Sequence, residues 1–459
     1  MQIYNTLSRK KETYIPQDQI KVYVCGVTPY DEAHLGHARP SIVWDVIKRY
    51  FNYQGYTVKM VQNFTDVDDK IIARSLREKR PALEISDYYS KRYLEAMDKL
   101  GVVRCDYYPR VSQYIIKIIE MVKGLIEKGH AYESSGDVYF KVNSFPTYGK
   151  LSGRNVVELR AGTRLAVEEN KQDPVDFALW KSAKPGEISW SSPWGEGRPG
   201  WHIECSAMAL DLLGESFDFH GGGLDLIFPH HENEIAQSEA YTGKQFVSFW
   251  IHNGLITIDN EKMSKSLGNF VTVEDLLREN TKEEIRFYIL STHYRTPLNF
   301  TWEGLKESAK GLKRLNNSFR SWQEEAKPLD WQNFSELNEL EKRFKDAMDD
   351  DFNTAQALGV LFDLNRLGNQ YLQQNDKRLG AALKLMHELG GILGIIKEKE
   401  EKAIQTDLLD KVVEILLELR LAAKKEKNWA LADKIREQLL EAGIILEDST
   451  SATRWKVKD

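Results

Sequence analysis

Along the first sixty residues, the pattern of apolar and polar positions changes from the period of a strand to that of a helix and back. β-Branched and polar residues alternate from 20 to 25 and stop at Gly26, as in a strand that ends in a turn. A second strand-like run covers residues 56–61. Between them, after Gly36, apolar residues recur at helical spacing, at positions 42, 43, 46, 47 and 50. This order predicts a βαβ unit and therefore a parallel sheet.

The middle of the chain interrupts this pattern. Glycine, proline and tryptophan accumulate between residues 149 and 200, and short strand-like pieces such as 137–142 appear. We interpret residues 115–200 as an insertion into the sheet domain. The sheet pattern resumes at 217–220, directly before three consecutive glycines.

The C-terminal third is predicted to be helical. Residues 305–396 show helical periodicity and contain few glycines or prolines. The charged run 397–402 has no apolar face and is interpreted as a linker; if it is instead the solvated end of a helix, the boundary stays in the same place. The remaining elements are two amphipathic helices, a short strand and a tail: 408–424, 429–440, 444–446 and the segment with Arg454 and Trp455.

Length, charge and cysteine content restrict the class of protein. At roughly 100–200 residues per domain, the 459 residues predict about three or four domains. The formal net charge of −6 argues against an indiscriminate nucleic-acid binder, although local basic regions still allow an RNA partner. Three widely spaced cysteines indicate a reducing compartment and no disulfide framework.

The chain has neither an apolar signal core at its N-terminus nor an apolar run that approaches the ~20 residues of a membrane helix. We therefore expect a cytoplasmic protein without membrane contact. No dimerisation helix is evident in the pattern, and we expect a monomer.

Two histidines lie at the start of the first predicted helix, in the string His34-Leu35-Gly36-His37. A helix N-terminus presents free backbone N–H groups and the positive end of the helix dipole, which suits a phosphate. Gly36 permits a close approach, and two imidazoles can donate hydrogen bonds as negative charge develops. So short a string is also compatible with two surface histidines. Its position at a strand-to-helix junction favours a phosphate site.

A lysine-rich string, Lys-Met-Ser-Lys-Ser, occupies residues 262–266, shortly before Gly268. Lys262 and Lys265 flank small polar residues, and this pattern predicts a flexible cationic loop that closes on a triphosphate. A lysine pair alone is more often a solvated loop, and only the combination with the histidine pair makes the string specific. No Walker A loop is present, because neither Gly-Lys pair precedes a serine or threonine, so ATP must be held by other means.

A candidate zinc set consists of Cys25, Cys205, His230 and Glu234. The last two residues are four apart and would share one face of a helix. Thiolate, imidazole and carboxylate groups are all good zinc ligands. However, the Cys-x-x-Cys spacing of zinc fingers is absent, and so is the second histidine of the metalloprotease pattern. Spacing alone favours buried free cysteines and a surface histidine, and Cys105 is interpreted as a small core residue.

Taken together, these residues resemble the class I aminoacyl-tRNA synthetases, which carry a His-x-Gly-His motif and a Lys-Met-Ser-Lys-Ser motif on a Rossmann-type sheet. Among them the chain is similar to the cysteinyl-tRNA synthetase family over its whole length. The matching strings, such as Gly-Trp-His-Ile-Glu-Cys-Ser, lie at 23–26, 63–70, 200–206, 220–226, 230–234 and 349–354. The resemblance implies an ATP-dependent ligase that forms cysteinyl-adenylate and transfers cysteine to the 3′-terminal adenosine of tRNA(Cys).

The resemblance also implies roles for individual residues. One zinc ion, which selects the cysteine thiolate, is bound by Cys25, Cys205, His230 and Glu234. ATP, which brings Mg²⁺, is contacted by His34, Gly36, His37, Lys262, Ser264 and Lys265. The catalytic groups among these are the two histidines and the two lysines. The amino-acid pocket is shaped by Gly26, Thr28, Thr65, Trp201 and Asp225.

The implied fold class is α/β: a Rossmann-type catalytic domain with an inserted connective domain, followed by a helical bundle and a small anticodon-binding domain. The sheet domain would comprise 1–114 and 201–250, with the insertion at 115–200. A stem-contact region with the mobile lysine loop, the bundle and the anticodon-binding domain would comprise 251–310, 311–396 and 405–459. Candidates for stacking on tRNA bases are Trp429, Arg454 and Trp455, although ordinary packing explains each of them equally well.

Two alternatives have distinguishable sequence features. A cysteine ligase that acts on a small amine, as in mycothiol biosynthesis, would keep both nucleotide motifs and the zinc set but would lack a tRNA-reading C-terminal region. A non-catalytic RNA-binding or zinc-structural protein would not need the phosphate-handling motifs. The chain has both the motifs and the C-terminal region, which favours the synthetase.

Overall fold

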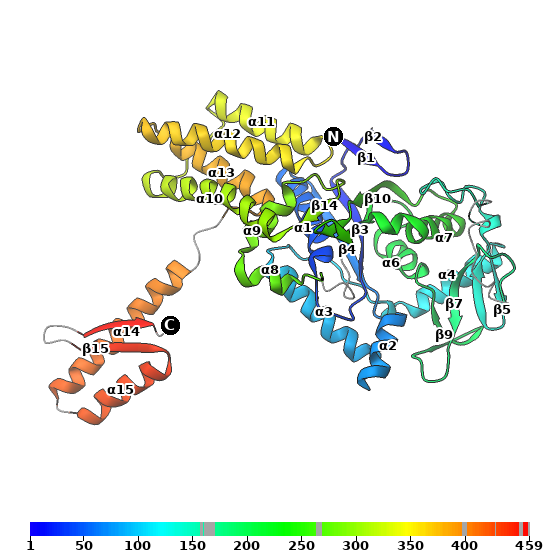
Figure 1. Cartoon of the computed structure of the whole chain (residues 1–459), viewed down its shortest axis with the longest axis horizontal. Helices are drawn as coiled ribbons and strands as arrows, with labels where there is room; N and C mark the ends of the chain where they lie inside the picture. The colour runs from blue at the N-terminus through cyan, green and yellow to red at the C-terminus, as the bar shows by residue number, and fades with distance from the viewer. Residues whose placement is uncertain are drawn as a thin grey trace. The chain divides into compact units, whose positions relative to one another are not determined.

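The computed structural model describes residues 1–156, 159, 170–262, 269–396, 402–426, 428–448 and 453–457. The chain divides into two compact units, Met1–Ile396 and Lys397–Asp459 (Figure 1). Among the described residues, no helix is long and apolar enough to cross a membrane.

A four-stranded parallel sheet forms the centre of the first unit, with the strand order β11-β10-β3-β4. The strands are β3 (Gln19–Val27), β4 (Thr57–Phe64), β10 (Phe217–Gly223) and β11 (Val247–Asn253). Tyr23 of β3 pairs with Val61 of β4 and with His220 of β10. The pairing places β3, which precedes the interruption in the sequence pattern, beside β10, which follows it. The predicted parallel sheet is confirmed.

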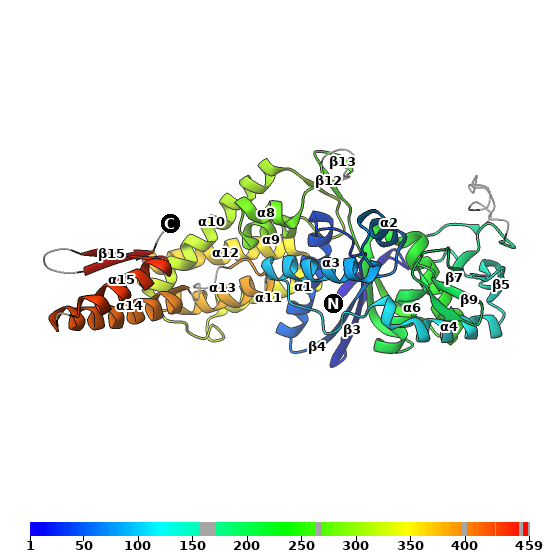
Figure 2. The same ribbon diagram turned by 90° about the horizontal axis from the view of Figure 1, so that it is seen from below.

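Alternate residues of β3 enter two different hydrophobic cores, as the period of a strand requires. Val22 and Val24 pack in the core that contains α1 (Leu35–Tyr53), whereas Tyr23 packs in the core that contains α6 (Ile203–Leu213) and α7 (Glu232–Thr242). Figures 1 and 2 show α1 on one side of the sheet and α6 on the other. Both faces are covered, as expected for a parallel sheet.

Between β4 and β10 the chain forms further helices and a separate antiparallel sheet. The helices are α2 (Asp69–Glu78), α3 (Ala82–Lys99) and α4 (Ile115–Glu127), with a 3₁₀ turn at Val111–Gln113. The sheet has the order β5-β6-β7-β9-β8, with β5 (Ala131–Ser134), β6 (Asp137–Phe140), β7 (Phe177–Ser182), β8 (Trp190–Ser192) and β9 (Gly195–Pro199).

The strand predicted at 137–142 ends two residues early. Val142 starts a 3₁₀ turn, Val142–Ser144, and its backbone N–H donates to the carboxylate of Asp176 at 2.9 Å. This bond replaces the strand pairing that a longer β6 would make.

Two small sheets flank the central one. An N-terminal hairpin, which the hydrophobic pattern did not indicate, pairs β1 (Gln2–Asn5) with β2 (Lys10–Thr13). The second sheet has the order β13-β12-β14 and consists of β12 (Ile256–Ile258), β13 (Glu261–Lys262) and β14 (Leu298–Phe300). The helices α8 (Val273–Glu279) and α9 (Lys282–Leu290) lie between β13 and β14 in the chain.

The predicted helical region consists of α10 (Trp302–Glu325), α11 (Ser335–Asp349), α12 (Thr354–Gln373) and α13 (Leu379–Leu393). The first of these begins three residues before the predicted start, because the Thr301 side chain accepts the Gly304 N–H and caps the helix. Apolar faces of all four helices enter the core shared with α1.

The second unit contains α14 (Lys402–Lys425), α15 (Trp429–Glu441), β15 (Ile444–Asp448) and β16 (Thr453–Val457). Its core consists of Val413, Ile435, Leu439, Ile444 and Leu446. The predicted tail around Arg454 and Trp455 was wrong: this segment is β16, an antiparallel partner of β15. Five residues cannot show a clear period by themselves, and the pairing with β15 supplies their hydrogen bonds. The predicted linker at 397–402 lies outside the described residues except for its last residue.

Candidate active site

Cys25, Cys205, His230 and Glu234 converge in the first unit. One potential ligand atom from each lies within 4.8 Å of the others. The Nε2 atom of His230 is 3.0 Å from Oε1 of Glu234 and 3.6 Å from Sγ of Cys205. The Sγ atom of Cys25 is 3.6 Å from the same Glu234 oxygen. The arrangement is that of a candidate metal site.

Four separate elements bring these side chains together. Cys25 lies near the carboxyl end of β3, and Cys205 lies in the first turn of α6. His230 belongs to a short π-helical segment, Ile227–His231, which leads directly into α7 with Glu234 in its first turn. The four-residue separation therefore places His230 and Glu234 on one face, although only the second residue is in a regular α-helix.

Further histidines surround this cluster, and sequence reasoning did not assign them a role. His220 Nε2 lies 2.8 Å from the second carboxylate oxygen of Glu234. His231 lies 3.1 Å from Cys25 Sγ through Nε2 and 2.7 Å from His252 through Nδ1. Because His220 and His231 also lie close to Cys25 and Glu234, these four residues form a second, overlapping candidate metal set. The only sequence signal was the density of histidines between 202 and 252.

The charges of the cluster are balanced within a buried environment. Burial would raise the pKa of Glu234, but His220 and His230 lower it to about 2. Burial would lower the pKa of His230, but the charge of Glu234 raises it to about 10. The hydrogen bond with Cys25 lowers the pKa of Cys205 to about 6, whereas burial raises the pKa of Cys25 well above its usual value. A divalent cation can replace the protons on His230 and Cys25.

His34 and His37 cap the N-terminus of α1. His34 Nδ1 accepts the Gly36 N–H at 3.1 Å, His37 Nδ1 accepts the His34 N–H at 3.4 Å, and the two rings stack with centroids 3.7 Å apart. Each ring therefore carries its proton on Nε2. Burial lowers the pKa of His34 to about 4 and that of His37 well below its usual value, so both rings are neutral near pH 7.

The segment that follows the lysine string is hydrogen-bonded to the residues on either side of His34. The Leu35 N–H donates to the Val271 carbonyl at 3.0 Å, and the Val273 N–H donates to the Ala33 carbonyl at 2.9 Å. His34 is thus paired antiparallel with Thr272. Lys262 is the last residue of β13, whereas Ser264 and Lys265 lie outside the described residues.

Three of the predicted pocket residues lie close to the cluster. The Gly26 N–H donates to the Asn63 side chain at 2.9 Å, and the Asn63 amide donates to the Thr65 hydroxyl at 3.2 Å. Trp201 is 45% exposed, and its ring lies 4.5 Å from the ring of His230. The other two, Thr28 and Asp225, follow β3 and β10 at the same carboxyl edge of the sheet.

The three predicted tRNA contacts belong to the second unit. Trp429 begins α15 and is 59% exposed. Arg454 and Trp455 lie in β16, where Trp455 packs against the core of the unit. Packing therefore accounts for Trp455, whereas Trp429 presents an exposed aromatic face.

Two family models match the chain. The model for the tRNA synthetases class I (C) catalytic domain covers residues 11–310, and the DALR domain covers residues 343–397. Methionyl-tRNA synthetase of Mycobacterium tuberculosis, solved with methionyl-adenylate, shares the fold with a TM-score of 0.62 and 15% identity over 82% of this chain and 90% of that one. LeuRS of Agrobacterium radiobacter, solved with tRNA and LeuAMS, has a TM-score of 0.62 and 11% identity over 83% and 86%. The class is thus that of the class I tRNA synthetases.

Curated relatives resolve the class further. The cysteine–tRNA ligase of Carboxydothermus hydrogenoformans is 51% identical over 99% of this chain and 100% of its own length. Those of Bacillus licheniformis and Desulforamulus reducens are 49% and 48% identical, again over 99% of this chain, and over 98% and 99% of their own lengths. The chain belongs to the cysteine–tRNA ligase family, which confirms the resemblance seen in the sequence.

Proposed function

We propose that this protein activates L-cysteine with ATP and transfers it to tRNA(Cys), and that Cys25, Cys205, His230 and Glu234 hold one zinc ion that selects the cysteine thiol. The observation that carries the proposal is the convergence of these four side chains at the carboxyl edge of the sheet that leads into the histidine-capped helix α1. Amino acid and nucleotide would then meet across the turn between β3 and α1.

The donor set suits zinc. Ligands bound 2.0–2.3 Å from a tetrahedral metal lie roughly 3.3–3.8 Å from one another. The separations of 3.0 Å and 3.6 Å around His230, and of 3.6 Å between Cys25 and Glu234, are close to this range. The overlapping set contains one thiol instead of two. The set with both cysteines is therefore the softer one and the better match to zinc.

Selection of cysteine over serine is the chemical reason for a metal in this pocket. An apolar pocket distinguishes such near-isosteres by only about 10²-fold. Zinc supplies a soft Lewis acid that binds a thiolate far better than a hydroxyl. Within the chain, Glu234 is held by His220, and Trp201 covers His230 on the solvent side. The backbone of Gly26 and the side chains of Thr28, Thr65 and Asp225 would complete the pocket.

The cysteine carboxylate attacks the α-phosphate of ATP, which gives cysteinyl-adenylate and releases pyrophosphate. Neutral His34 and His37 would donate Nε2–H to phosphate oxygens as charge develops, with the backbone N–H groups of Gly36 and its neighbours at the positive end of α1. Lys262, Ser264 and Lys265 would close over the β- and γ-phosphates, and Mg²⁺ accompanies ATP. The described segment 271–273 tethers this loop to α1.

The second step transfers cysteine to the tRNA. The 2′-hydroxyl of the terminal adenosine is the proposed first acceptor. The bundle at 311–396 would lie along the tRNA, and the unit at 405–459 would reach the anticodon. Exposed Trp429 is the best-supported base-stacking candidate, because its face is open to solvent.

The decisive experiment is the charging of total bacterial tRNA with labelled cysteine, with labelled serine as the control. ATP-dependent label on tRNA with cysteine and not with serine is the expected result. Cysteine-dependent pyrophosphate exchange without label on tRNA would instead indicate a ligase that acts on a small amine.

A further inference from the structure

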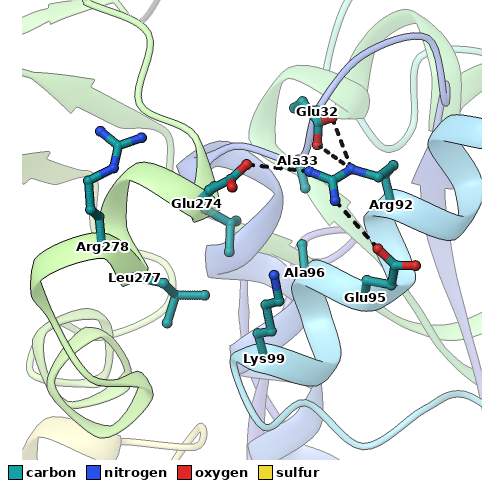
Figure 3. Close-up of a pocket in the computed structure, with 10 residues that line it drawn as sticks. Glu32, Ala33, Arg92, Glu95, Ala96, Lys99, Glu274, Leu277 and Arg278 are labelled. Atoms are coloured by element: carbon teal, nitrogen blue, oxygen red, sulfur yellow. Dashed lines mark hydrogen bonds and ion pairs between the residues drawn. The ribbon is translucent and has the colours of Figure 1, made fainter. Parts of the chain in front are cut away.

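One arginine on α3 contacts carboxylates from three segments of the catalytic unit. Arg92 Nε lies 3.0 Å and 3.2 Å from the two carboxylate oxygens of Glu32. A terminal nitrogen of Arg92 lies 3.3 Å from Glu274, and the other lies 3.5 Å from Glu95. Figure 3 shows the guanidinium between Glu32 and Glu274, with Glu95 on the opposite side. Arg92 is thus the hub of an ion-pair network.

Two of these carboxylates flank the nucleotide motifs. Glu32 lies two residues before His34, and Glu274 is the second residue of α8, two residues after Thr272. Since Thr272 is paired with His34, Arg92 spans the same junction as the backbone hydrogen bonds. The arginine therefore ties the entry into α1 to the segment that follows the lysine loop. By contrast, Glu95 belongs to α3 itself, so its pair with Arg92 bridges nothing.

The neighbouring residue on α3 contacts the other side of the histidine motif. Tyr93 is hydrogen-bonded to Ser41 at 3.0 Å, and its ring packs edge-on against His37 with centroids 6.0 Å apart. Consecutive residues of α3 thus contact Glu32, two residues before His34, and His37 itself. This placement gives α3 a role in the geometry of the site.

An open pocket makes the arginine bridge important. A pocket of about 470 Å³ lies between α3 and α8, and its lining includes Ala33, Ala96 and Leu277 (Figure 3). Apolar packing does not fill this space, so the ion pairs supplement the backbone hydrogen bonds at this junction. Without Arg92, Glu32 and Glu274 would face each other as like charges and repel. That repulsion would push the segment after the lysine loop away from α1.

We propose that Arg92 is a positioning residue for ATP: through Glu32 and Glu274 it holds residues 271–274 in register with His34. The inference rests on the proposed function, because it assigns the loop to ATP. Arg92 touches no reacting atom. Its contribution is the placement of His34 and of residues 271–274 relative to each other when the negative charge of the transition state develops.

The test measures cysteine-dependent ATP–pyrophosphate exchange by the full chain, with kcat and the KM values for ATP and cysteine determined separately. The variants are Arg92→Gln, Glu274→Gln and the double variant, and Glu95→Gln is the matched control, since it removes the same charge from the same arginine without breaking the bridge. Wild-type exchange is measured first, because its absence would overturn the proposed function and not the role of Arg92.

We expect Arg92→Gln and Glu274→Gln each to lower kcat about 10-fold, with the KM for cysteine changed less than about 2-fold. The double variant should be no slower than Arg92→Gln alone, because both changes break one link. These ion pairs are partly exposed, so the melting temperature should shift by less than about 2 °C. The proposal is overturned if Glu95→Gln slows exchange as much as Glu274→Gln. It is also overturned if the decrease in kcat of the double variant equals the product of the decreases in Arg92→Gln and Glu274→Gln.

Discussion

The Nε2 atom of His220 lies 2.8 Å from Oε2 of Glu234, and both side chains are fully buried. This bond leaves the other oxygen, Oε1, facing His230 at 3.0 Å. A carboxylate with one oxygen held in this way presents the second in a fixed direction. Partners of this kind orient metal ligands and set their basicity.

We therefore expect His220→Phe to weaken zinc binding by about 10- to 100-fold. Phenylalanine keeps a ring against Trp250, which stacks on His220 at 4.5 Å, but it cannot donate to Glu234. Zinc affinity is measured by competition with a chromogenic chelator. His130→Phe, a change directly before β5, is the control, and equal affinities in the two variants would contradict the orienting role of His220.

Replacement of a proposed ligand should remove both metal and specificity. Cys205→Ser should lower the bound zinc from one ion per chain to none, and preference for cysteine over serine in pyrophosphate exchange should fall to about 10²-fold or less. Cys105→Ser alters a half-buried thiol packed against the core that contains α1. This variant should keep both the bound zinc and the preference for cysteine. Elemental analysis measures the metal content, and pyrophosphate exchange with each amino acid measures the selectivity. Undiminished selectivity for cysteine in Cys205→Ser would rule out the zinc role.

The proposed contribution of His34 to catalysis can be separated from its contribution to the helix. His34→Asn keeps a side chain that caps α1 well, but it removes the Nε2–H donor. We expect kcat for cysteine activation to fall about 10²- to 10³-fold, with the KM for cysteine nearly unchanged. The melting temperature is measured alongside, and a large loss of stability with little loss of kcat would mean that His34 serves the fold alone.

A methyl group at Gly26 should be strongly destabilising. A Cβ atom there would lie 1.5 Å from the Asn63 carbonyl oxygen, so β3 and β4 would have to separate beside Cys25. We expect Gly26→Ala to cost about 1–3 kcal/mol in the free energy of unfolding and to weaken zinc binding. Gly359→Ala in α12 is the control, because its Cβ meets nothing within 4 Å and alanine favours a helix by about 0.5–1 kcal/mol. Urea unfolding of both variants measures the two free energies of unfolding, which should decrease in Gly26→Ala and not in Gly359→Ala.

The buried His252 should make stability depend on pH. Burial lowers the pKa of His252 from 6.5 to about 3. Between these values the unfolded chain binds more protons, so the free energy of unfolding rises with pH by up to about 1.4 kcal/mol per pH unit from this residue. The contribution of neutral His252 to the free energy of unfolding is fully present above pH 6.5 and is lost as the pH falls toward 3.

His252→Gln should reduce the slope by about 1 kcal/mol per pH unit from about pH 4.5 to 6.5, in urea titrations of the unfolding free energy. Thr6→Val removes the 2.8 Å hydrogen bond to His252 but keeps the titrating ring, so its slope should match the wild type. A wild-type slope in His252→Gln would show that other groups cause the pH dependence.

Much of the fold followed from local pattern. The period-two run before Gly26, the helical period after Gly36 and the strand that follows predicted β3, α1 and β4 within a few residues, because each element must present an apolar face to a core. The string from 34 to 37 could be assigned to a helix start for the same reason. The hydrogen bonds that cap α1 join residues within this string, so the string alone is enough to indicate a helix start.

The candidate metal site could be predicted only in part from local pattern. Cys25, Cys205, His230 and Glu234 could be named as candidates through a resemblance, yet their spacing alone favoured free cysteines. His220, His231 and His252 were not assigned, although they form the surroundings of the site. Arg92 likewise had no local signal, because its partners Glu32 and Glu274 are 60 and 182 residues away.

By itself, therefore, the sequence determined the order of the elements, the His-x-Gly-His and Lys-Met-Ser-Lys-Ser strings and the family. The tertiary structure decided which elements meet: that β10 enters between β3 and β11, that α6 and α7 cover the same face, and that the tail at 453–457 pairs as a strand. Periodicity states which face of an element is buried, but the partner of that face depends on packing between residues far apart in the chain. Buried polar groups such as Glu234 find their hydrogen bonds only through that packing.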